Sequence, residues 1–135
     1  MLIADDHAAM RRSLTQVLES ESGVRVVGEA PDGDVAIQLA RELHPDVVVM
    51  DVIMPCVDGI DATRQILRQC PETIVIGLSV HDSGAYAARM LQAGARAYVL
   101  KDGGAEELVS ALRATRTGHT YLSSGIEGLD RPGSL

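Results

Sequence analysis

Five short apolar runs alternate along this chain with longer segments whose apolar residues recur at the spacing of a helix. Three of the runs are rich in Val and Ile without polar alternation, which is typical of strands buried on both faces. Such strands form parallel sheets covered by helices on each side, so the repeated order predicts a doubly wound (βα)5 fold of the α/β class. The expected strands are Leu2–Ala4, Val24–Glu29, Asp46–Met50, Thr73–Leu78 and Ala97–Leu100, and the expected helices are Ala8–Ser20, Gly33–Leu43, Ile60–Gln69, Ser83–Ala93 and Ala105–Thr117.

Turn and cap residues fall between these segments. Asp32 is suited to cap the second helix, and the pair His44-Pro45 should end it. Gly94 is a candidate for the residue that ends the fourth helix. With short, right-handed connections, this order favours a single parallel sheet in the flavodoxin-like strand order 2-1-3-4-5.

The composition limits what the chain can bind. Hydrophobic residues make up 46% of the chain, and because Phe and Trp are absent the core must be aliphatic. The formal net charge of -7 would repel nucleic acid, whose binding depends on Lys and Arg that neutralise phosphates. Cys56 and Cys70 fit no metal-binding spacing and are too few for a disulfide framework, which favours reduced cysteines in a cytoplasmic protein. No apolar run approaches the ~20 residues of a membrane span.

The character of the sequence changes after Thr117. Residues 118–135 contain four glycines, Pro132 and several serines, and they have no helical period. We therefore expect residues 1–117 to form the globular domain and residues 118–135 to form a C-terminal tail or linker.

Charged and hydroxyl side chains follow four of the five expected strands. Asp5 and Asp6 follow the first strand, Asp51 the third, Ser79 the fourth and Lys101 the fifth. In an open parallel sheet the carboxyl ends of the strands share one edge, where ligands bind. Clustered carboxylates suit Mg2+, and a carboxylate beside Mg2+ can attack a phosphoryl group to form an aspartyl phosphate. The single lysine of the chain would neutralise the phosphoryl oxygens there.

Each of these residues also has an ordinary explanation. Asp5 and Asp6 could cap the helix that starts near Ala8, and Asp51 could be a turn residue before Pro55. Lys101 could be a solvated lysine and Ser79 a loop serine. It is their joint placement on four strand ends that favours a phosphoryl site.

The motifs around these residues resemble the receiver domain of two-component response regulators. The likeness covers residues 1 to about 123 and is closest to the LuxR/NarL subfamily, whose members carry a C-terminal helix-turn-helix domain. It rests on Ala4-Asp5-Asp6-His7, on Met50-Asp51-Val52-Ile53-Met54-Pro55-Cys56-Val57-Asp58-Gly59, on Leu78-Ser79, on Gly94-Ala95-Arg96-Ala97-Tyr98-Val99-Leu100-Lys101-Asp102 and on Gly118-His119-Thr120-Tyr121-Leu122-Ser123.

The resemblance implies a role for each site residue. Asp51 would be the phosphoacceptor; Asp6, Asp51 and the Ile53 carbonyl would be ligands of Mg2+, with Asp5 acting through a metal-bound water. Ser79 and Lys101 would bind phosphoryl oxygens, and Tyr98 would be the aromatic switch residue that responds to Ser79.

The resemblance also implies partners. A sensor histidine kinase would supply the phosphoryl group, and homodimers could form through the first and fifth helices. The domain would be a switch rather than an enzyme with an external substrate, and DNA would be bound only through a separate domain. Because only four residues precede Asp5 and the chain stops in the linker, we expect a fragment of a longer regulator.

Two other classes of protein share part of this pattern. A haloacid-dehalogenase-like, Mg2+-dependent phosphatase also uses an aspartate nucleophile, but it needs a second aspartate two residues later, where this chain has Ile53. A flavodoxin-like binding module needs a Ser/Thr/Gly-rich phosphate loop after the first strand, where Asp5 and Asp6 would repel a flavin phosphate.

Overall fold

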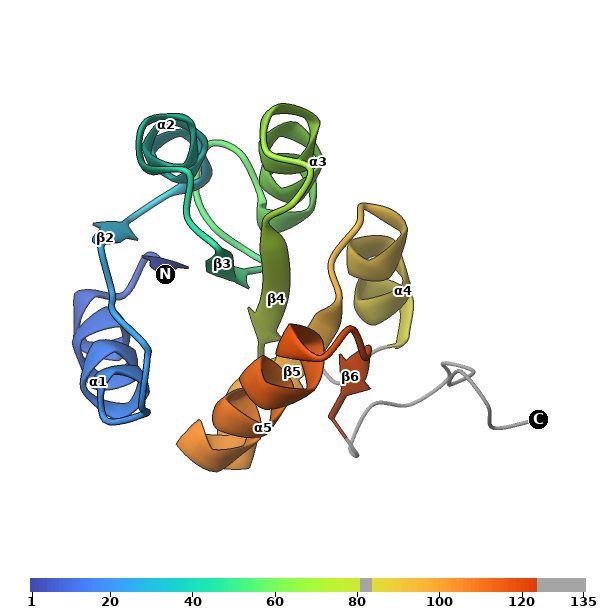
Figure 1. The fold of residues 1–135 in the computed structure, drawn as a ribbon. Helices are drawn as coiled ribbons and strands as arrows, with labels where there is room; N and C mark the ends of the chain where they lie inside the picture. The colour runs from blue at the N-terminus through green and yellow to red at the C-terminus, as the bar shows by residue number, and fades with distance from the viewer. Residues whose placement is uncertain (81–83, 124–135) are drawn as a thin grey trace.

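The computed structural model describes residues 1–80 and 84–123, which form a parallel sheet between two layers of helices (Figure 1). The strand order is β2-β1-β3-β4-β5-β6, so the predicted order 2-1-3-4-5 is confirmed and a short sixth strand is added at one edge. The strands are β1 (Leu2–Ala4), β2 (Gly28–Ala30), β3 (Val47–Asp51), β4 (Ile74–Ser79), β5 (Ala97–Leu100) and β6 (Tyr121–Leu122).

The helices divide between the two faces of the sheet. One face is covered by α1 and α5 and the other by α2, α3 and α4, as Figure 1 shows. Their bounds are α1 (Ala8–Glu19), α2 (Gly33–Leu43), α3 (Gly59–Gln69), α4 (Gly84–Gln92) and α5 (Gly104–Arg116), with a 3-10 turn, η1 (Lys101–Gly103), before α5. Within the described residues, no helix is long and apolar enough to cross a membrane.

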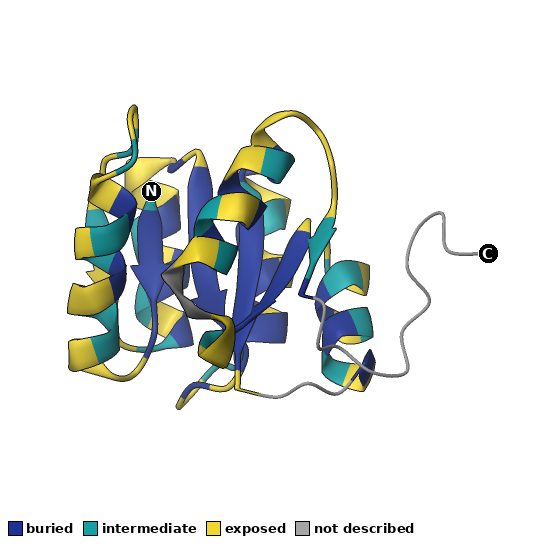
Figure 2. Ribbon diagram, turned by 90° about the horizontal axis from the view of Figure 1, so that it is seen from below, coloured by how far each residue is buried: buried dark blue, intermediate teal, exposed yellow. Residues whose placement is uncertain are grey.

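Each face of the sheet has its own aliphatic core. Figure 2 shows the buried strands between helices whose outer surfaces are exposed. Val48 and Met50 of β3 pack toward α2, α3 and α4, while Val47 and Val49 pack toward α1 and α5. This alternation follows from the pleat of a strand, and it explains why β3 is apolar at every position before Asp51.

The helix boundaries follow the cap residues. The Asp32 side chain accepts a hydrogen bond from the Val35 amide at 2.9 Å, which confirms the predicted cap of α2. His44 ends that helix in the left-handed conformation, with φ 46°, directly before Pro45. Asp58 caps α3 in the same way through the Asp61 amide.

Two edges of the sheet differ from the expectation. β2 starts at Gly28 rather than Val24, because the ladder with β1 begins where Gly28 pairs with Leu2, the first residue of that strand. Residues 121–122 were expected in the tail but form β6, which pairs in parallel with β5. The rest of the predicted tail, from residue 124, lies outside the described residues.

Candidate phosphoryl and metal site

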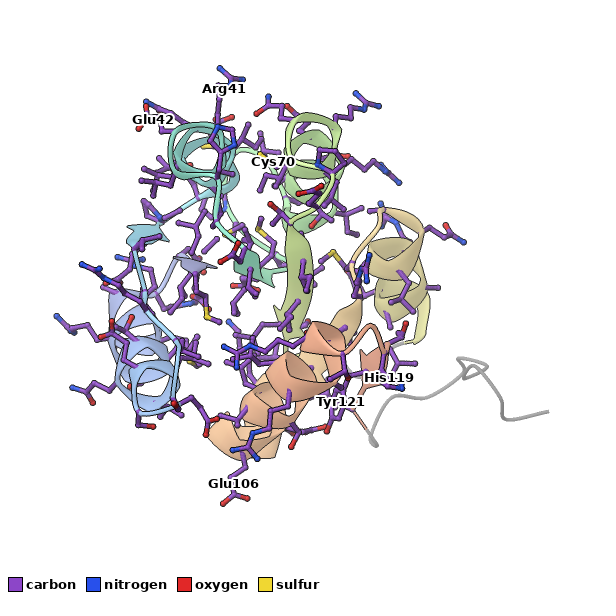
Figure 3. The ribbon with its side chains drawn as sticks, viewed as in Figure 1. Arg41, Glu42, Cys70, Glu106, His119 and Tyr121 are labelled. Carbon is purple, nitrogen blue, oxygen red and sulfur yellow. The ribbon has the colours of Figure 1, made fainter. Side chains whose placement is uncertain are left out.

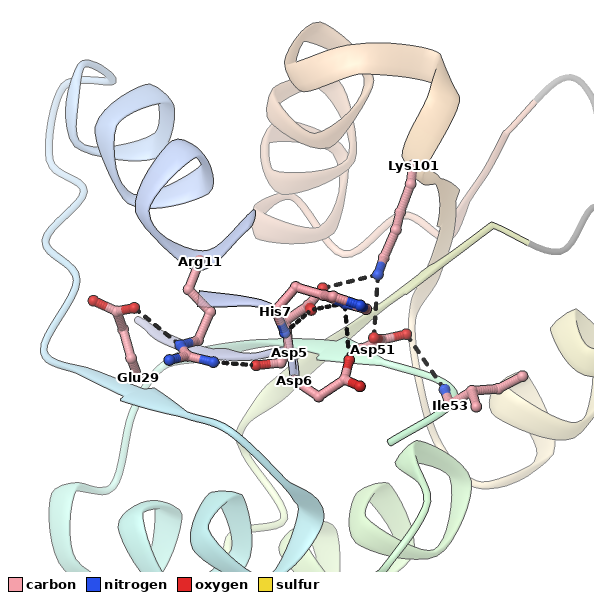
Figure 4. A network of polar contacts seen from close by, with 8 residues as sticks. All are labelled: Asp5, Asp6, His7, Arg11, Glu29, Asp51, Ile53 and Lys101. Atoms are coloured by element: carbon pink, nitrogen blue, oxygen red, sulfur yellow. Dashed lines mark hydrogen bonds and ion pairs between the residues drawn. The ribbon is translucent and has the colours of Figure 1, made fainter. Parts of the chain in front are cut away.

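The carboxyl ends of β1, β3 and β5 bring three of the predicted site residues into direct contact. Lys101 Nζ lies 2.9 Å from Asp5 Oδ2 and 3.1 Å from Asp51 Oδ2 (Figure 4). β1 and β3 are neighbours at the centre of the sheet, and the Lys101 side chain extends toward them from β5. Residues far apart in the sequence therefore share one site because the strands are parallel and end at the same edge.

The Asp51 carboxylate is almost completely buried, with 6% of its side chain exposed. Its Oδ1 accepts a hydrogen bond from the Ile53 amide at 3.3 Å, and its Oδ2 pairs with Lys101. Burial raises the pKa of Asp51 above its ordinary value, and this effect outweighs the opposing charge of Lys101. Asp51 thus lies in a poorly solvated pocket with one cation beside it.

Among the described contacts, Lys101 is the only lysine or arginine whose side chain pairs with these two buried carboxylates. Burial alone would lower the pKa of Lys101, but its close contacts with Asp5 and Asp51 and their negative charges together raise it. Since only 10% of the side chain is exposed, the ammonium is held in place rather than freely solvated. A compact ammonium on a flexible side chain can pair with both carboxylates at once.

The other acidic residue, Asp6, completes a cluster with metal-ligand geometry. One ligand atom each from Asp5, Asp6, His7 and Asp51 lies within 4.8 Å of the others. Asp5 Oδ2 is buried, and among the described residues no hydrogen bond of good geometry reaches it. The ion pair with Lys101 is therefore the interaction that offsets the burial of its charge. Three carboxylates with an incompletely satisfied buried oxygen fit a hard divalent cation such as Mg2+, which prefers oxygen ligands.

Sequence reasoning did not single out two residues that support this acidic cluster. His7 donates its backbone N–H to Asp5 Oδ1 at 2.8 Å, and its Nδ1 lies 3.0 Å from Asp6 Oδ1. Arg11 of α1 donates to the Asp5 carbonyl oxygen at 2.6 Å and pairs with Glu29 of β2 at 3.2 Å. No pattern in the sequence pairs Arg11 with these groups, because the contact requires α1 to fold over the end of β1.

Of the remaining predicted residues, Ser79 and Ile53 lie near the same carboxyl ends of the strands, whereas Tyr98 lies in the core. Ser79 ends β4, is buried, and is paired in register with Leu100 of β5. Tyr98 is fully buried and packs in the core on the α4 side, where Gly77 leaves room for its ring. The Ile53 side chain is 47% exposed at the rim of the site.

A family model described as the response regulator receiver domain matches residues 1–113. The chain belongs to this family. Members are signalling proteins rather than enzymes that turn over an external substrate, so the phosphatase and flavodoxin-like alternatives are set aside.

Individual relatives of this receiver domain agree. Response regulator GacA from Pseudomonas aeruginosa is 42% identical over 126 residues, which cover 93% of this chain and 59% of that protein. The receiver domain therefore spans about three fifths of the length of this curated relative.

Two solved structures are similar to this chain, and the first is of the LuxR family that the sequence predicts. A LuxR-family response regulator from Aurantimonas sp. SI85-9A1 has a TM-score of 0.89 and 36% identity, covering 93% of this chain and 89% of that one. RcsB from Salmonella enterica serovar Typhimurium, bound to promoter DNA with the phosphomimetic BeF3-, has a TM-score of 0.84 and 30% identity, covering 93% of this chain and 62% of that one.

Proposed function

We propose that this receiver domain accepts a phosphoryl group on Asp51 from a sensor histidine kinase and thereby switches an output domain. The observation that carries the proposal is the buried Asp51 carboxylate, held between Lys101 and the amide of Ile53. Burial strips water from the carboxylate, and the raised pKa indicates that its charge is poorly solvated there. In an acyl phosphate the negative charge lies on the phosphoryl oxygens instead, where Lys101 would pair with it.

In the transfer, one Asp51 carboxylate oxygen bonds to phosphorus as the bond from phosphorus to the donor histidine nitrogen breaks. The Lys101 ammonium, 3.1 Å from Asp51 Oδ2, would then pair with a phosphoryl oxygen. Ser79, at the end of β4, would donate its hydroxyl to another, and Tyr98 would respond to that movement as the switch residue.

The metal proposed for this site is Mg2+. Asp6, Asp51 and the Ile53 carbonyl oxygen would be its protein ligands, and Asp5 would act through a metal-bound water. When bound, the ion would neutralise negative charge on the phosphoryl oxygens. The oxygen-rich cluster of Asp5, Asp6 and Asp51 supports this assignment.

The output is proposed to be transcription. In this arrangement residues 1–117 are the receiver and residues 118–135 lead to a separate DNA-binding domain, as the greater length of GacA and the promoter complex of RcsB suggest. A homodimer through α1 and α5 is part of the proposal, because these helices lie side by side on one face of the sheet. Within the chain, Arg113 of α5 pairs with Glu21, two residues after the end of α1. We also propose a cytoplasmic location, which both free cysteines, Cys56 and Cys70, support.

The test is phosphorylation by acetyl phosphate, followed by intact-mass measurement. We expect the chain to gain one phosphoryl group with Mg2+ and none with EDTA. Asp51→Asn should gain none, whereas Asp58→Asn, which keeps the cap acceptor of α3, should behave as the wild type. Equal incorporation in Asp51→Asn and wild type would refute the assignment.

A further inference from the structure

The segment that follows α5 is attached to β5, the strand that ends directly before Lys101. The Ser123 amide donates to the Tyr98 carbonyl oxygen at 3.0 Å, and the Leu100 amide donates to Ser123 Oγ at 2.9 Å. Ser123 is fully buried, and Leu100 directly precedes Lys101. One side chain of the predicted tail therefore holds the last residue of β5.

Several contacts fix this segment before it reaches Ser123. The His119 amide returns to the Ala114 carbonyl oxygen at 3.0 Å, and the Tyr121 amide donates to the Arg96 carbonyl oxygen at 3.1 Å. The Tyr121 hydroxyl lies 3.4 Å from Glu107 Oε1 of α5, and Figure 3 shows His119 and Tyr121 beside that helix. β6 is thus anchored to both β5 and α5, and Ser123 Oγ is presented from a fixed position.

The hydroxyl has a specific task where the β5–β6 ladder stops. β6 ends at Leu122, one residue before Ser123. Leu122 is paired in register with Tyr98, so the ladder stops before it reaches Leu100. A buried backbone N–H without an acceptor is costly, so the Leu100 amide needs a partner from a side chain. Ser123 Oγ supplies it at the residue that leads into Lys101.

We propose that Ser123 is a positioning residue for Lys101, acting by fixing the end of β5 through the Leu100 amide. The inference rests on the proposed phosphoryl function of Lys101. The same hydrogen bonds connect the segment that would lead toward the output domain directly to β5, the strand that carries Tyr98 and ends one residue before Lys101. The connection is short, because Ser123 Oγ accepts a hydrogen bond from the Leu100 amide and Leu100 is joined directly to Lys101.

Comparing the affinities for two ligands tests this role. Mg2+ would be held by residues at the ends of β1 and β3, whereas beryllofluoride, a phosphoryl mimic, would also need Lys101. In Ser123→Ala of the full chain, we expect Mg2+ affinity to stay within about twofold of wild type. Beryllofluoride affinity, measured by calorimetry at saturating Mg2+, should fall roughly 3- to 10-fold, the effect of one lost buried hydrogen bond. Hydrogen exchange of the Leu100 amide should quicken.

Three variants complete the design. Ser123→Thr keeps the hydroxyl and should restore beryllofluoride affinity and Leu100 protection. Ser123→Cys is nearly isosteric with a weak acceptor, so it should show the same difference between the two affinities if Ser123→Ala does not fold. Thr120→Ala removes an exposed hydroxyl from the same segment and should match the wild type.

The outcomes separate the inference from the function on which it rests. If wild type binds beryllofluoride and Ser123→Ala binds it equally, the positioning role is refuted. Parallel losses of Mg2+ and beryllofluoride affinity would indicate general destabilisation and would also refute it. If wild type binds no beryllofluoride with Mg2+, the proposed function fails and this inference fails with it.

Discussion

Asp51 holds a charge that its surroundings disfavour. Its carboxylate is buried beside the buried carboxylate of Asp5, and Lys101 is shared between the two. Ionisable groups in such positions are common at functional sites, since structure built only for stability would avoid them. Keeping Asp51 ionised in this position therefore lowers the stability of the folded domain, as expected of a residue kept for function rather than for stability.

The raised pKa of Asp51 predicts how the metal-free domain responds to pH. Because this pKa is higher in the folded than in the unfolded chain, ionisation favours unfolding, and stability is lost as pH rises through the folded-state pKa. Asp51→Asn removes this loss. In EDTA we expect the melting temperature of Asp51→Asn to exceed that of wild type at pH 7, and the difference to shrink toward pH 4.

The control for this pH series is Asp58→Asn, which removes a carboxylate but keeps an N-cap acceptor. It should show no comparable gain at pH 7. An Asp51→Asn protein less stable than wild type at pH 7 would mean that the Lys101 pair outweighs burial.

Asp6 should matter mainly through the metal. Asp6→Ala removes a carboxylate that is 30% exposed and faces the other two acids, so the metal-free domain should be slightly more stable. The Mg2+-induced rise in melting temperature should fall sharply, because a tenfold weaker affinity removes about 1.4 kcal/mol of ligand stabilisation.

Thermal melts with and without Mg2+ measure both effects in Asp6→Ala. Asp61→Asn, an exposed acid on α3, serves as the matched control and should keep the full Mg2+ response. An unchanged Mg2+ response in Asp6→Ala would exclude Asp6 as a ligand.

The junction between β3 and α3 sets the position of Asp51 at the scale of elements. The Gly59 amide donates to the Val52 carbonyl oxygen at 2.8 Å, and a Cβ at Gly59 would overlap the Asp51 carbonyl oxygen. The chain can therefore turn this tightly only with glycine at the start of α3. The neighbouring Asp58 cap holds the same turn from the helix side.

Gly59→Ala should consequently disturb both stability and chemistry. The new methyl group must push α3 away from the end of β3, which we expect to cost about 1–3 kcal/mol and to slow phosphorylation of Asp51 by acetyl phosphate. Gly94→Ala is the comparison, because Gly94 has φ 111° and lies between α4 and β5, before the amino end of that strand. Its new methyl group would meet only the Leu67 side chain of α3 and not the backbone at Asp51. Gly94→Ala should destabilise by roughly 1–2 kcal/mol without slowing phosphorylation of the folded protein.

At the scale of the whole molecule, the negative net charge of this chain disfavours DNA binding, although the related RcsB binds promoter DNA. The chain carries a formal net charge of -7, and its single lysine is bound to two carboxylates. Arg11, Arg64 and Arg113 are each paired with a carboxylate as well. No counterion release large enough to drive DNA binding is expected from this surface.

We therefore predict that residues 1–135 alone do not bind DNA sequence-specifically, with or without beryllofluoride. Selection from a pool of random duplexes at 50 to 200 mM salt, roughly the range over which phosphate contacts weaken binding most visibly, should enrich no sequence. Enrichment of a defined site would show that this domain reads DNA directly.

The period of the apolar residues determined the fold class, because strands buried on both faces and one-sided helices have different repeats. Strand-end positions also predicted that Asp5, Asp51, Ser79 and Lys101 share an edge, since parallel strands all point the same way. Tertiary structure alone decided the Arg11 contact with Asp5, the limits of β2 and the attachment of Ser123 to Leu100. These depend on which backbone groups face each other across distant elements, and a local pattern of residue types carries no information about such distances.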